Sequence, residues 1–401
     1  MKYLTRTIWV LSLVSLFNDV SSEMLYPVMP LFLASIGFSS VMIGFLEGLA
    51  EATAGLSKGY FGRWSDASGK RLPFVQIGYL MSSVSKPMMV LFTNPLWIFS
   101  TRTTDRLGKG VRTAARDALL SDESSAANKG KVFGFHRALD TTGAAIGPAF
   151  ALVFLIYFPG QYKWLFLLAF IPALLSVSLT FFIKEKKRAP KQVSSFRLSQ
   201  VYDYLKESST DYRKMLTVLL LFALFNSSDL FLLMKLKAGG LSDSYVITFY
   251  ILYNLVFALA AFPVGYIADR IGLKKMLVVG LLIFVLVYAG FGFNETFIGY
   301  MVLMSLYGIY AACTDGISKA LISNMVPKKE TGSAIGTYSG LSSVMILLAS
   351  SLAGLIWHYV SPQFMFLFSA SGVLLVVALL MWLKIEMKNH AEPPLETAGN
   401  R

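Results

Sequence analysis

The sequence predicts an all-α integral membrane protein of twelve transmembrane helices. Of its 401 residues, 55% are hydrophobic and only 15% are charged, which is more apolar than a single water-soluble core requires. Its apolar stretches are long enough to cross a hydrocarbon layer of about 30 Å as helices, and they lack the alternation of β-barrel strands. The twelve expected helices lie near residues 8–34, 39–62, 73–92, 95–118, 131–156, 163–183, 214–236, 244–267, 274–293, 296–322, 332–357 and 363–384.

Positive charges indicate how the chain lies in the membrane. The formal net charge is +13, but the basic residues gather in alternate loops rather than on one folded face, so nucleic acid is not an expected partner. The basic loops are at residues 70–71, 129–131, 184–188, 274–275 and 328–329. The positive-inside rule then places these loops and both termini in the cytoplasm. We expect a multi-pass protein of the plasma membrane, which is the inner membrane in a bacterium.

The chain divides into two halves with a related plan. Residues 184–213 interrupt the apolar pattern with basic residues and are expected to form a cytoplasmic linker. It separates a bundle of six helices at 1–183 from a second at 214–387, and 388–401 form a cytoplasmic tail. A loop motif follows the second helix of each half, as Gly62-x-x-x-Asp66-x-x-Gly69-Lys70-Arg71 and as Gly265-x-x-x-Asp269-Arg270-x-Gly272-x-Lys274-Lys275.

This repeated loop resembles the signature of the major facilitator superfamily, and the resemblance covers the chain up to about Lys388. The resemblance implies two bundles around a central cavity, lined chiefly by helices 1, 4, 7 and 10, that opens alternately to either side of the membrane. In that family the acid of the loop holds the cytoplasmic helix ends together. Glycines suit this loop, because tight turns need backbone angles that glycine adopts readily. The gating role falls on Gly62, Asp66, Gly69 and Arg71 in the first copy and on Asp269, Arg270 and Gly272 in the second.

Helix five carries a second resemblance. Gly143-x-x-x-Gly147-Pro148 is similar to a signature of the superfamily's antiporters, although Phe150 and Ala151 stand where paired glycines would follow. The motif favours export by antiport over uptake. The structural alternative is close helix packing, because small residues spaced by four let helices approach.

Charged residues of the fourth expected helix are the first candidates for a solute site. A charge near the bilayer centre costs roughly 2.5 to 3.5 kcal/mol, so such residues face protein or a wet cavity. Arg102, Asp105 and Lys109 are spaced by three and four and share one helical face, with Arg106 at a similar depth. These bases suit a solute with a carboxylate or phosphate group. Further expected solute contacts are Asn18, Asn226 and Asp229.

Acidic residues of helices one and two are the candidates for proton coupling. Asp19 and Glu23 are four residues apart and share one face, as do Glu47 and Glu51. A carboxylate that exchanges an arginine partner for a proton when the cavity changes side can couple solute and proton movement. Asp19 and Glu23 are the leading candidates, and Glu47 follows.

The same charges also have a purely structural interpretation. In it, ion pairs between helices replace any role in transport. The pairs would be Asp19 or Glu23 with Arg102 or Arg106, Asp105 with Lys109, and Glu47 or Glu51 with the helix-four arginines or Lys58. In the second half, Asp315 and Lys319 are expected to form a cytoplasmic gate, with solute contact as the alternative.

These observations predict a secondary active transporter that exports a small polar or anionic organic solute in exchange for protons, and acts as a monomer in the lipid bilayer. The alternatives are a proton-coupled importer of a small organic anion and a receptor that binds without transport. The single Cys313 excludes an internal disulfide, and the sequence suggests no metal or cofactor. Without a nucleophile beside a base, or a phosphate-binding loop, an enzyme is not expected.

Overall fold

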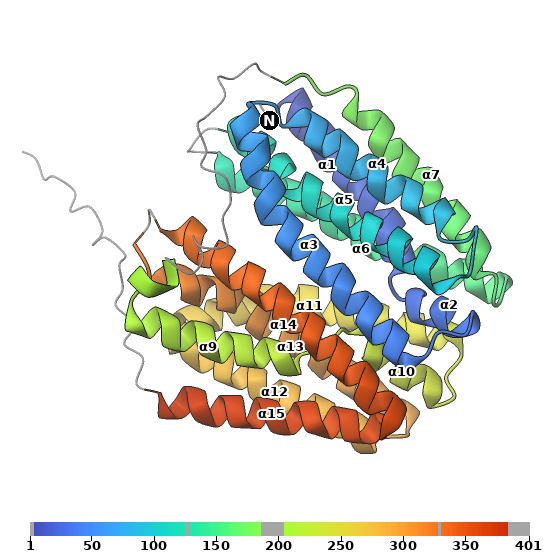
Figure 1. Cartoon of the computed structure of the whole chain (residues 1–401), viewed down its shortest axis with the longest axis vertical. Coiled ribbons are helices and arrows are strands. Elements are labelled where there is room, and N and C mark those ends of the chain that lie inside the picture. The colour runs from blue at the N-terminus through green and yellow to red at the C-terminus, as the bar shows by residue number, and fades with distance from the viewer. Residues whose placement is uncertain (1–3, 125–127, 186–203, 328–329, 384–401) are drawn as a thin grey trace, which may run out of the picture.

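The computed structural model describes residues 4–124, 128–185, 204–327 and 330–383, and every regular element within them is a helix (Figure 1). The first half contains α1 (Arg6–Leu25), α2 (Met29–Ser35), α3 (Ser40–Ser68), α4 (Leu72–Met88), α5 (Pro95–Asp122), α6 (Lys129–Tyr157) and α7 (Tyr162–Thr180). The second half contains α9 (Thr210–Phe225), α10 (Leu230–Ala238), α11 (Asp243–Ile271), α12 (Leu273–Phe293), α13 (Phe297–Asn324), α14 (Thr331–Tyr359) and α15 (Pro362–Trp382). Three regions of the sequence analysis lie outside the described residues, namely most of the linker (186–203), the tail (388–401) and the loop at 328–329.

The expected twelve crossings are present, and three pairs of equivalent helices have equal lengths in the two halves. α3 and α11 contain 29 residues each, α5 and α13 contain 28 each, and α6 and α14 contain 29 each. The first crossing of each half is broken, into α1 and α2 and into α9 and α10. Pro30 in the first turn of α2 explains the first break. The predicted internal repeat is therefore visible in the helices themselves.

Within the described residues, nine helical segments are long and apolar enough to cross a membrane by length and composition. α3, α4 and α5 are not among them. α4 has only 17 residues, whereas α3 and α5 have 29 and 28 but carry several charged side chains. These charges must therefore find partners inside the protein.

The loop motif ends α3 as predicted at one glycine but not at the other. Gly69 is the C-cap of α3 and has φ of 67°, which favours glycine. Gly62 lies inside α3, and a Cβ atom there would be 2.8 Å from the Cβ of Ala114. The expectation of a tight turn at Gly62 is wrong, because this glycine lets α3 approach α5. We call the end of the protein with Gly69 the loop end, and the opposite end, with α2 and α10, the far end.

Other glycines show where the halves touch. α3 packs against α14, and a Cβ atom at Gly44 would lie 2.3 Å from the backbone oxygen of Ser350. One at Gly354 would lie 2.5 Å from the backbone oxygen of Ser40. Nearer the loop end, a Cβ atom at Gly59 would meet nothing within 4 Å. The halves therefore meet toward the far end and diverge toward the loop end, as Figure 1 shows.

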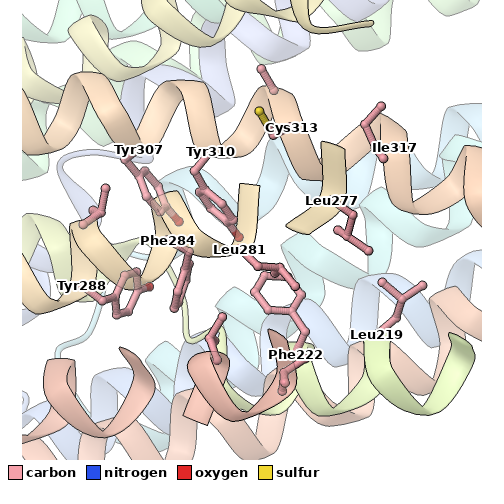
Figure 2. Close-up of a cluster of buried hydrophobic side chains, with 14 of the residues drawn as sticks. Leu219, Phe222, Leu277, Leu281, Phe284, Tyr288, Tyr307, Tyr310, Cys313 and Ile317 are labelled. Carbon is pink, nitrogen blue, oxygen red and sulfur yellow. The ribbon is translucent and has the colours of Figure 1, made fainter. Parts of the chain in front are cut away.

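Aromatic side chains dominate the packing of the second half. Figure 2 shows Phe222, Phe284, Tyr288 and Tyr310 among its buried residues. The rings of Phe284 and Tyr288 are stacked with centroids 3.9 Å apart. This half is thus held mainly by apolar contact, whereas the first half also buries charges.

Candidate functional site

Two arginines of α5 are held by two glutamates of α3. Arg102 donates from Nε and Nη2 to the two carboxylate oxygens of Glu47, at 2.9 Å each. Arg106 lies 3.1 Å from Glu51 and 3.9 Å from Glu47. The Glu47 and Arg102 side chains are only 1% and 7% exposed. Glu47 and Glu51 therefore pair with arginines of α5, as the structural interpretation of these charges expects.

Asp105 interacts with α4 rather than with Lys109. Its carboxylate lies 4.0 Å from Nζ of Lys86 and 3.5 Å from Arg102. Lys86 is buried and also donates to the backbone oxygen of Ser82, at 2.9 Å. The suggested pair of Asp105 with Lys109 is thus replaced by a contact between helices.

A polar pocket lies in the first half between α1, α4 and α5. Asp19 and Glu23 on α1 face it from one side, and the bases of α5 face it from the other. Its lining contains Asp19, Ser22, Glu23, Leu25, Tyr26, Met29, Ser85, Lys86, Met89, Arg102, Asp105, Arg106, Lys109, Arg112 and Phe166. All four predicted positions on helix four therefore line one pocket, together with the predicted acids of helix one.

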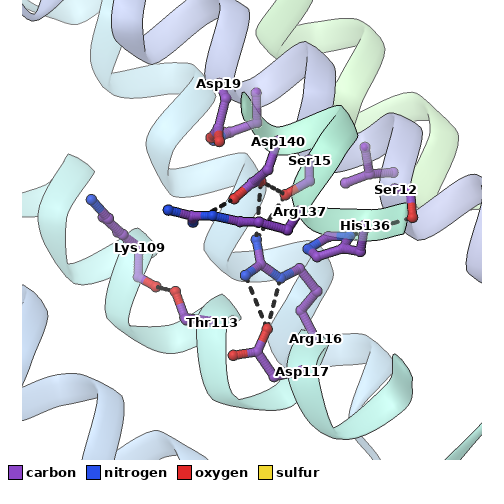
Figure 3. A network of polar contacts seen from close by, with 12 residues as sticks. Ser12, Ser15, Asp19, Lys109, Thr113, Arg116, Asp117, His136, Arg137 and Asp140 are labelled. Atoms are coloured by element: carbon purple, nitrogen blue, oxygen red, sulfur yellow. Dashed lines mark hydrogen bonds and ion pairs between the residues drawn. The ribbon is translucent and has the colours of Figure 1, made fainter. Parts of the chain in front are cut away.

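Two cations in this pocket lack an acidic partner. Among the described residues, no carboxylate lies within 4 Å of Lys109 or Arg112. Arg112 donates to Oγ of Ser82 at 2.6 Å and lies 4.7 Å from the ring centre of Tyr79. Its guanidinium is thus fixed in position, while Lys109 is exposed and extends away from α5 (Figure 3).

The acids of α1 have partners other than the arginines of the pocket wall. Glu23 accepts a hydrogen bond of 2.8 Å from the hydroxyl of Tyr250 on α11, which joins the two halves. Asp19 accepts one of 3.2 Å from the side chain of Asn18. Neither acid forms an ion pair with Arg102 or Arg106 in the described structure.

Asn226 and Asp229 mark the break between α9 and α10 and lie outside the lining of this pocket. Asp229 accepts a hydrogen bond of 2.6 Å from the hydroxyl of Tyr307. The side-chain oxygen of Asn226 is buried without a partner among the described residues. The structure does not bring these two predicted solute contacts together with those of helix four.

Tyrosine rings connect the pocket with Asp229. Tyr26, which lines the pocket, has its ring 5.4 Å from that of Tyr250. The rings of Tyr250 and Tyr253 are 5.9 Å apart, and those of Tyr253 and Tyr307 are 5.1 Å apart. The surface between the halves is therefore aromatic on the side of the second half.

The predicted gating residues differ between the two loop copies. Arg71 pairs with Asp66 at 2.7 Å and also contacts Asp122 at the end of α5. In the second copy, Arg270 stacks on the ring of Tyr266, 4.3 Å from its centre. Asp269 has no cation within 4 Å in the described part of the chain, so of the two loop copies only the first forms an ion pair there.

Asp315 and Lys319 interact with each other, at 3.1 Å, and both are exposed. They lie in the part of α13 that follows the aromatic cluster, away from the lining of the pocket. Three residues of the site, Lys86, Arg112 and Tyr250, were not predicted from the sequence. A lysine within the apolar run 73–92 was a usable signal for Lys86, but nothing local distinguished Tyr250 from a packing residue.

Twelve crossings in two similar halves, with a charged pocket between helices, define a membrane transporter rather than an enzyme. A sequence model described as Major Facilitator Superfamily matches residues 11–251 and 216–400. The chain belongs to this superfamily.

An uncharacterized MFS-type transporter of Methanocaldococcus jannaschii is 31% identical over 384 residues, which cover 93% of this chain and 95% of the relative. The quinolone resistance protein NorA of Staphylococcus aureus is 26% identical over 122 residues, 30% of this chain and 31% of NorA. Among solved structures, a mutant of the nucleoside transporter NupG has a TM-score of 0.79 at 12% identity, over 94% of this chain and 99% of that one.

Proposed function

We propose that this transporter is a secondary active antiporter that exports a small polar or anionic organic solute in exchange for protons. The observation that carries the proposal is the pair of cations, Lys109 and Arg112, that face the pocket without an acidic partner in the described structure. A guanidinium that is fixed in position, beside a mobile ammonium group, suits a solute with a carboxylate or phosphate group.

The solute would bind at the α5 wall of the pocket. Arg102 and Arg106 are occupied by Glu47 and Glu51 and would shape the wall, together with Asp105. Arg112 would provide the bidentate contact and Lys109 the mobile charge. Asn18, Asn226 and Asp229 would contact the solute when the second half closes over the pocket.

Protons would bind to the acids on the opposite wall. Asp19 and Glu23 line the same pocket as the two cations, and neither is fixed by an arginine of α5. A solute anion and a protonated carboxyl can therefore alternate in one small space, as antiport requires. Glu47 is a weaker candidate because both of its oxygens accept from Arg102.

The basic loops support one orientation of the transporter in the membrane. With the loop end in the cytoplasm, the pocket opens to the cytoplasm in this arrangement, and the far end is closed. The contacts of Arg71 at the loop end, and Asp315 with Lys319, would rearrange when the halves close there. Export is favoured over import by the partial similarity to NorA and by the Gly143-x-x-x-Gly147-Pro148 motif.

The proposal can be tested by untargeted comparison of metabolites inside and outside cells that express the wild type, Lys109→Met or Lys235→Met. Lys235 lies on α10 outside the pocket lining and loses the same charge. We expect a compound enriched outside with the wild type and with Lys235→Met but not with Lys109→Met. Enrichment inside would reverse the direction. Binding of that compound without flux in proteoliposomes, under either imposed pH gradient, would indicate a receptor.

A further inference from the structure

A second polar cluster lies behind the pocket, where α1 and α6 touch. A Cβ atom at Gly143 would be 2.4 Å from the backbone oxygen of Leu16 and 3.1 Å from the Cβ of Asp19. Asp140 precedes Gly143 by about one turn, so it shares the face of α6 that meets α1. This close approach brings the side chains of Asp19 and Asp140 together (Figure 3).

The Asp19 and Asp140 side chains lie next to each other at this contact between α1 and α6 (Figure 3). Asp140 also accepts a hydrogen bond of 2.6 Å from the hydroxyl of Ser15. Its side chain is 12% exposed. Carboxylate oxygens have no proton of their own to donate, so two carboxyl groups can form a hydrogen bond only if one of them is protonated.

We propose that Asp19 and Asp140 form a carboxyl pair that binds one proton, which they share. The proposal identifies the proton site of the antiporter and rests on the proton coupling proposed above. Asp140 is the new member, because the antiporter-like motif of the same helix begins only at Gly143. The arrangement follows the general rule that two adjacent carboxylates avoid ionising together.

Arg116 on α5 competes with the proton for this pair. Its guanidinium lies 3.9 Å from Asp140, donates to Oγ of Ser15 at 2.7 Å and pairs with Asp117 at 2.9 Å. A small shift of α5 toward α6 would shorten the contact with Asp140 and replace the proton by the guanidinium. The proton then leaves the carboxyl oxygen for water in the open pocket, and the arginine keeps its own charge.

Other charged groups near the pair are few. On α6, Arg137 lies 3.3 Å from Asp140 but is 71% exposed, and His136 is directed to Ser12, 3.4 Å from its hydroxyl. On α1, Glu23 is one turn beyond Asp19 and is bonded to Tyr250. The only charged residue of α7, Lys163, lies in the first turn of that helix, at the far end. Arg116, whose side chain is 14% exposed, is therefore the cation that can exchange with the proton.

Asp19 belongs both to this pair and to the lining of the solute pocket. A bound anion beside Lys109 and Arg112 places a negative charge in the same pocket as Asp19, which lines the opposite wall. Protonation of the pair and release of the anion are thereby linked through one side chain. The coupling requires no long relay between the two sites.

The test uses infrared spectra of the purified full-length protein in acidic and alkaline buffer, in water and in deuterium oxide. We expect a carboxylic-acid carbonyl band that shifts in deuterium oxide, vanishes in alkaline buffer, and is absent from Asp140→Asn and from Asp19→Asn. Because the pair holds one proton, the double variant should lose no more intensity than either single variant. Asp211→Asn, a surface change on α9, should retain the band.

A band that persists in Asp140→Asn would overturn the proposal, as would its absence from the wild type. If Asp140→Asn does not fold, Asp140→Glu serves in its place, because it keeps the carboxyl and should move the band without removing it; an unmoved band then also counts against the pair. A wild-type band with the expected mutant pattern, but transport that ignores the pH gradient, would refute the antiport function and leave the carboxyl pair intact.

Discussion

Glu47 accepts two parallel hydrogen bonds from Nε and Nη2 of Arg102, at 2.9 Å each, inside the first half of the protein. This bidentate geometry is the strongest form of ion pair between side chains. Because Arg102 is paired with Glu47, the cations of the pocket that remain available to an anion lie about two and three turns further along α5, at Lys109 and Arg112.

The buried pair makes a prediction about stability. Glu47→Gln or Arg102→Gln removes the bidentate partner of a buried charge, which keeps only a longer contact, Arg102 with Asp105 at 3.5 Å or Glu47 with Arg106 at 3.9 Å. Breaking a buried ion pair typically costs roughly 3 to 5 kcal/mol. We expect thermal unfolding in detergent at a clearly lower temperature for each single variant. Lys109→Gln removes an exposed charge that has no carboxylate within 4 Å among the described residues, so this variant should unfold at the same temperature as the wild type. Equal stability of Arg102→Gln and Lys109→Gln would contradict the structural role of Arg102.

The hydrogen bond between Tyr250 and Glu23 joins the halves, so its loss should favour opening of the far end. A typical intramolecular hydrogen bond contributes about 1 kcal/mol, which corresponds to roughly a fivefold change in population. In a Cys313→Ser background, a cysteine at Met29 reports opening because Met29 is buried in this arrangement. We expect Tyr250→Phe to increase its rate of labelling by a membrane-impermeant maleimide.

Tyr300→Phe is the matched control for this labelling experiment. Tyr300 is as buried as Tyr250, but its hydroxyl has no hydrogen-bond partner in the described structure. Its removal should leave the labelling rate of the cysteine at position 29 unchanged. An equal increase in both variants would mean that loss of a buried hydroxyl, rather than of the contact between halves, controls opening.

A larger side chain at the contact between α3 and α14 should also oppose closure of the far end. A Cβ atom at Gly48 would lie 2.9 Å from the backbone of Leu347. Overpacking of this kind costs about 1 to 3 kcal/mol, so Gly48→Val should accelerate labelling at position 29. Gly59→Val introduces the same residue on the same helix where nothing lies within 4 Å. If Gly59→Val labels as fast as Gly48→Val, the effect comes from the altered helix and not from the contact.

The two copies of the loop motif should differ in importance. Asp66 is paired with Arg71, which also contacts Asp122, whereas Asp269 has no such partner in the described residues. We therefore expect Asp66→Asn to slow transport in proteoliposomes several-fold more than Asp269→Asn. The relevant measurement is the initial rate for the solute identified by the export experiment. Equal rates in the two variants would argue that the ion pair at the first loop has no part in the transport cycle.

The sequence predicted what depends on distance along the chain. Helix lengths follow from apolar runs, and the pairing of Asp66 with Arg71 follows from a short loop motif. The common face of Arg102, Asp105 and Lys109 follows from helical spacing alone. Each of these predictions needs only the geometry of one element.

Partners on different helices depend on how each helix is rotated about its axis, which spacing does not determine. From the sequence, Glu47 and Glu51 could be named only as alternative partners for the arginines. Lys86 was not predicted because a single lysine changes the mean polarity of an apolar run very little. The link between Glu23 and Tyr250 joins residues 227 positions apart in the chain. No local signal distinguishes such a tyrosine from those that only pack.

The close approach of α3 and α14 at Gly44 and Gly354 has an energetic consequence for the transport cycle. Contacts of backbone with glycine carry no formal charge, so separation of α3 from α14 at these positions leaves no buried ion without its partner. The free-energy difference between the two orientations of the halves can then remain small. A tenfold preference of a solute for one orientation, equivalent to about 1.4 kcal/mol, is enough to bias such an equilibrium substantially. A weakly bound solute is therefore sufficient to shift the protein from one orientation of the two halves to the other.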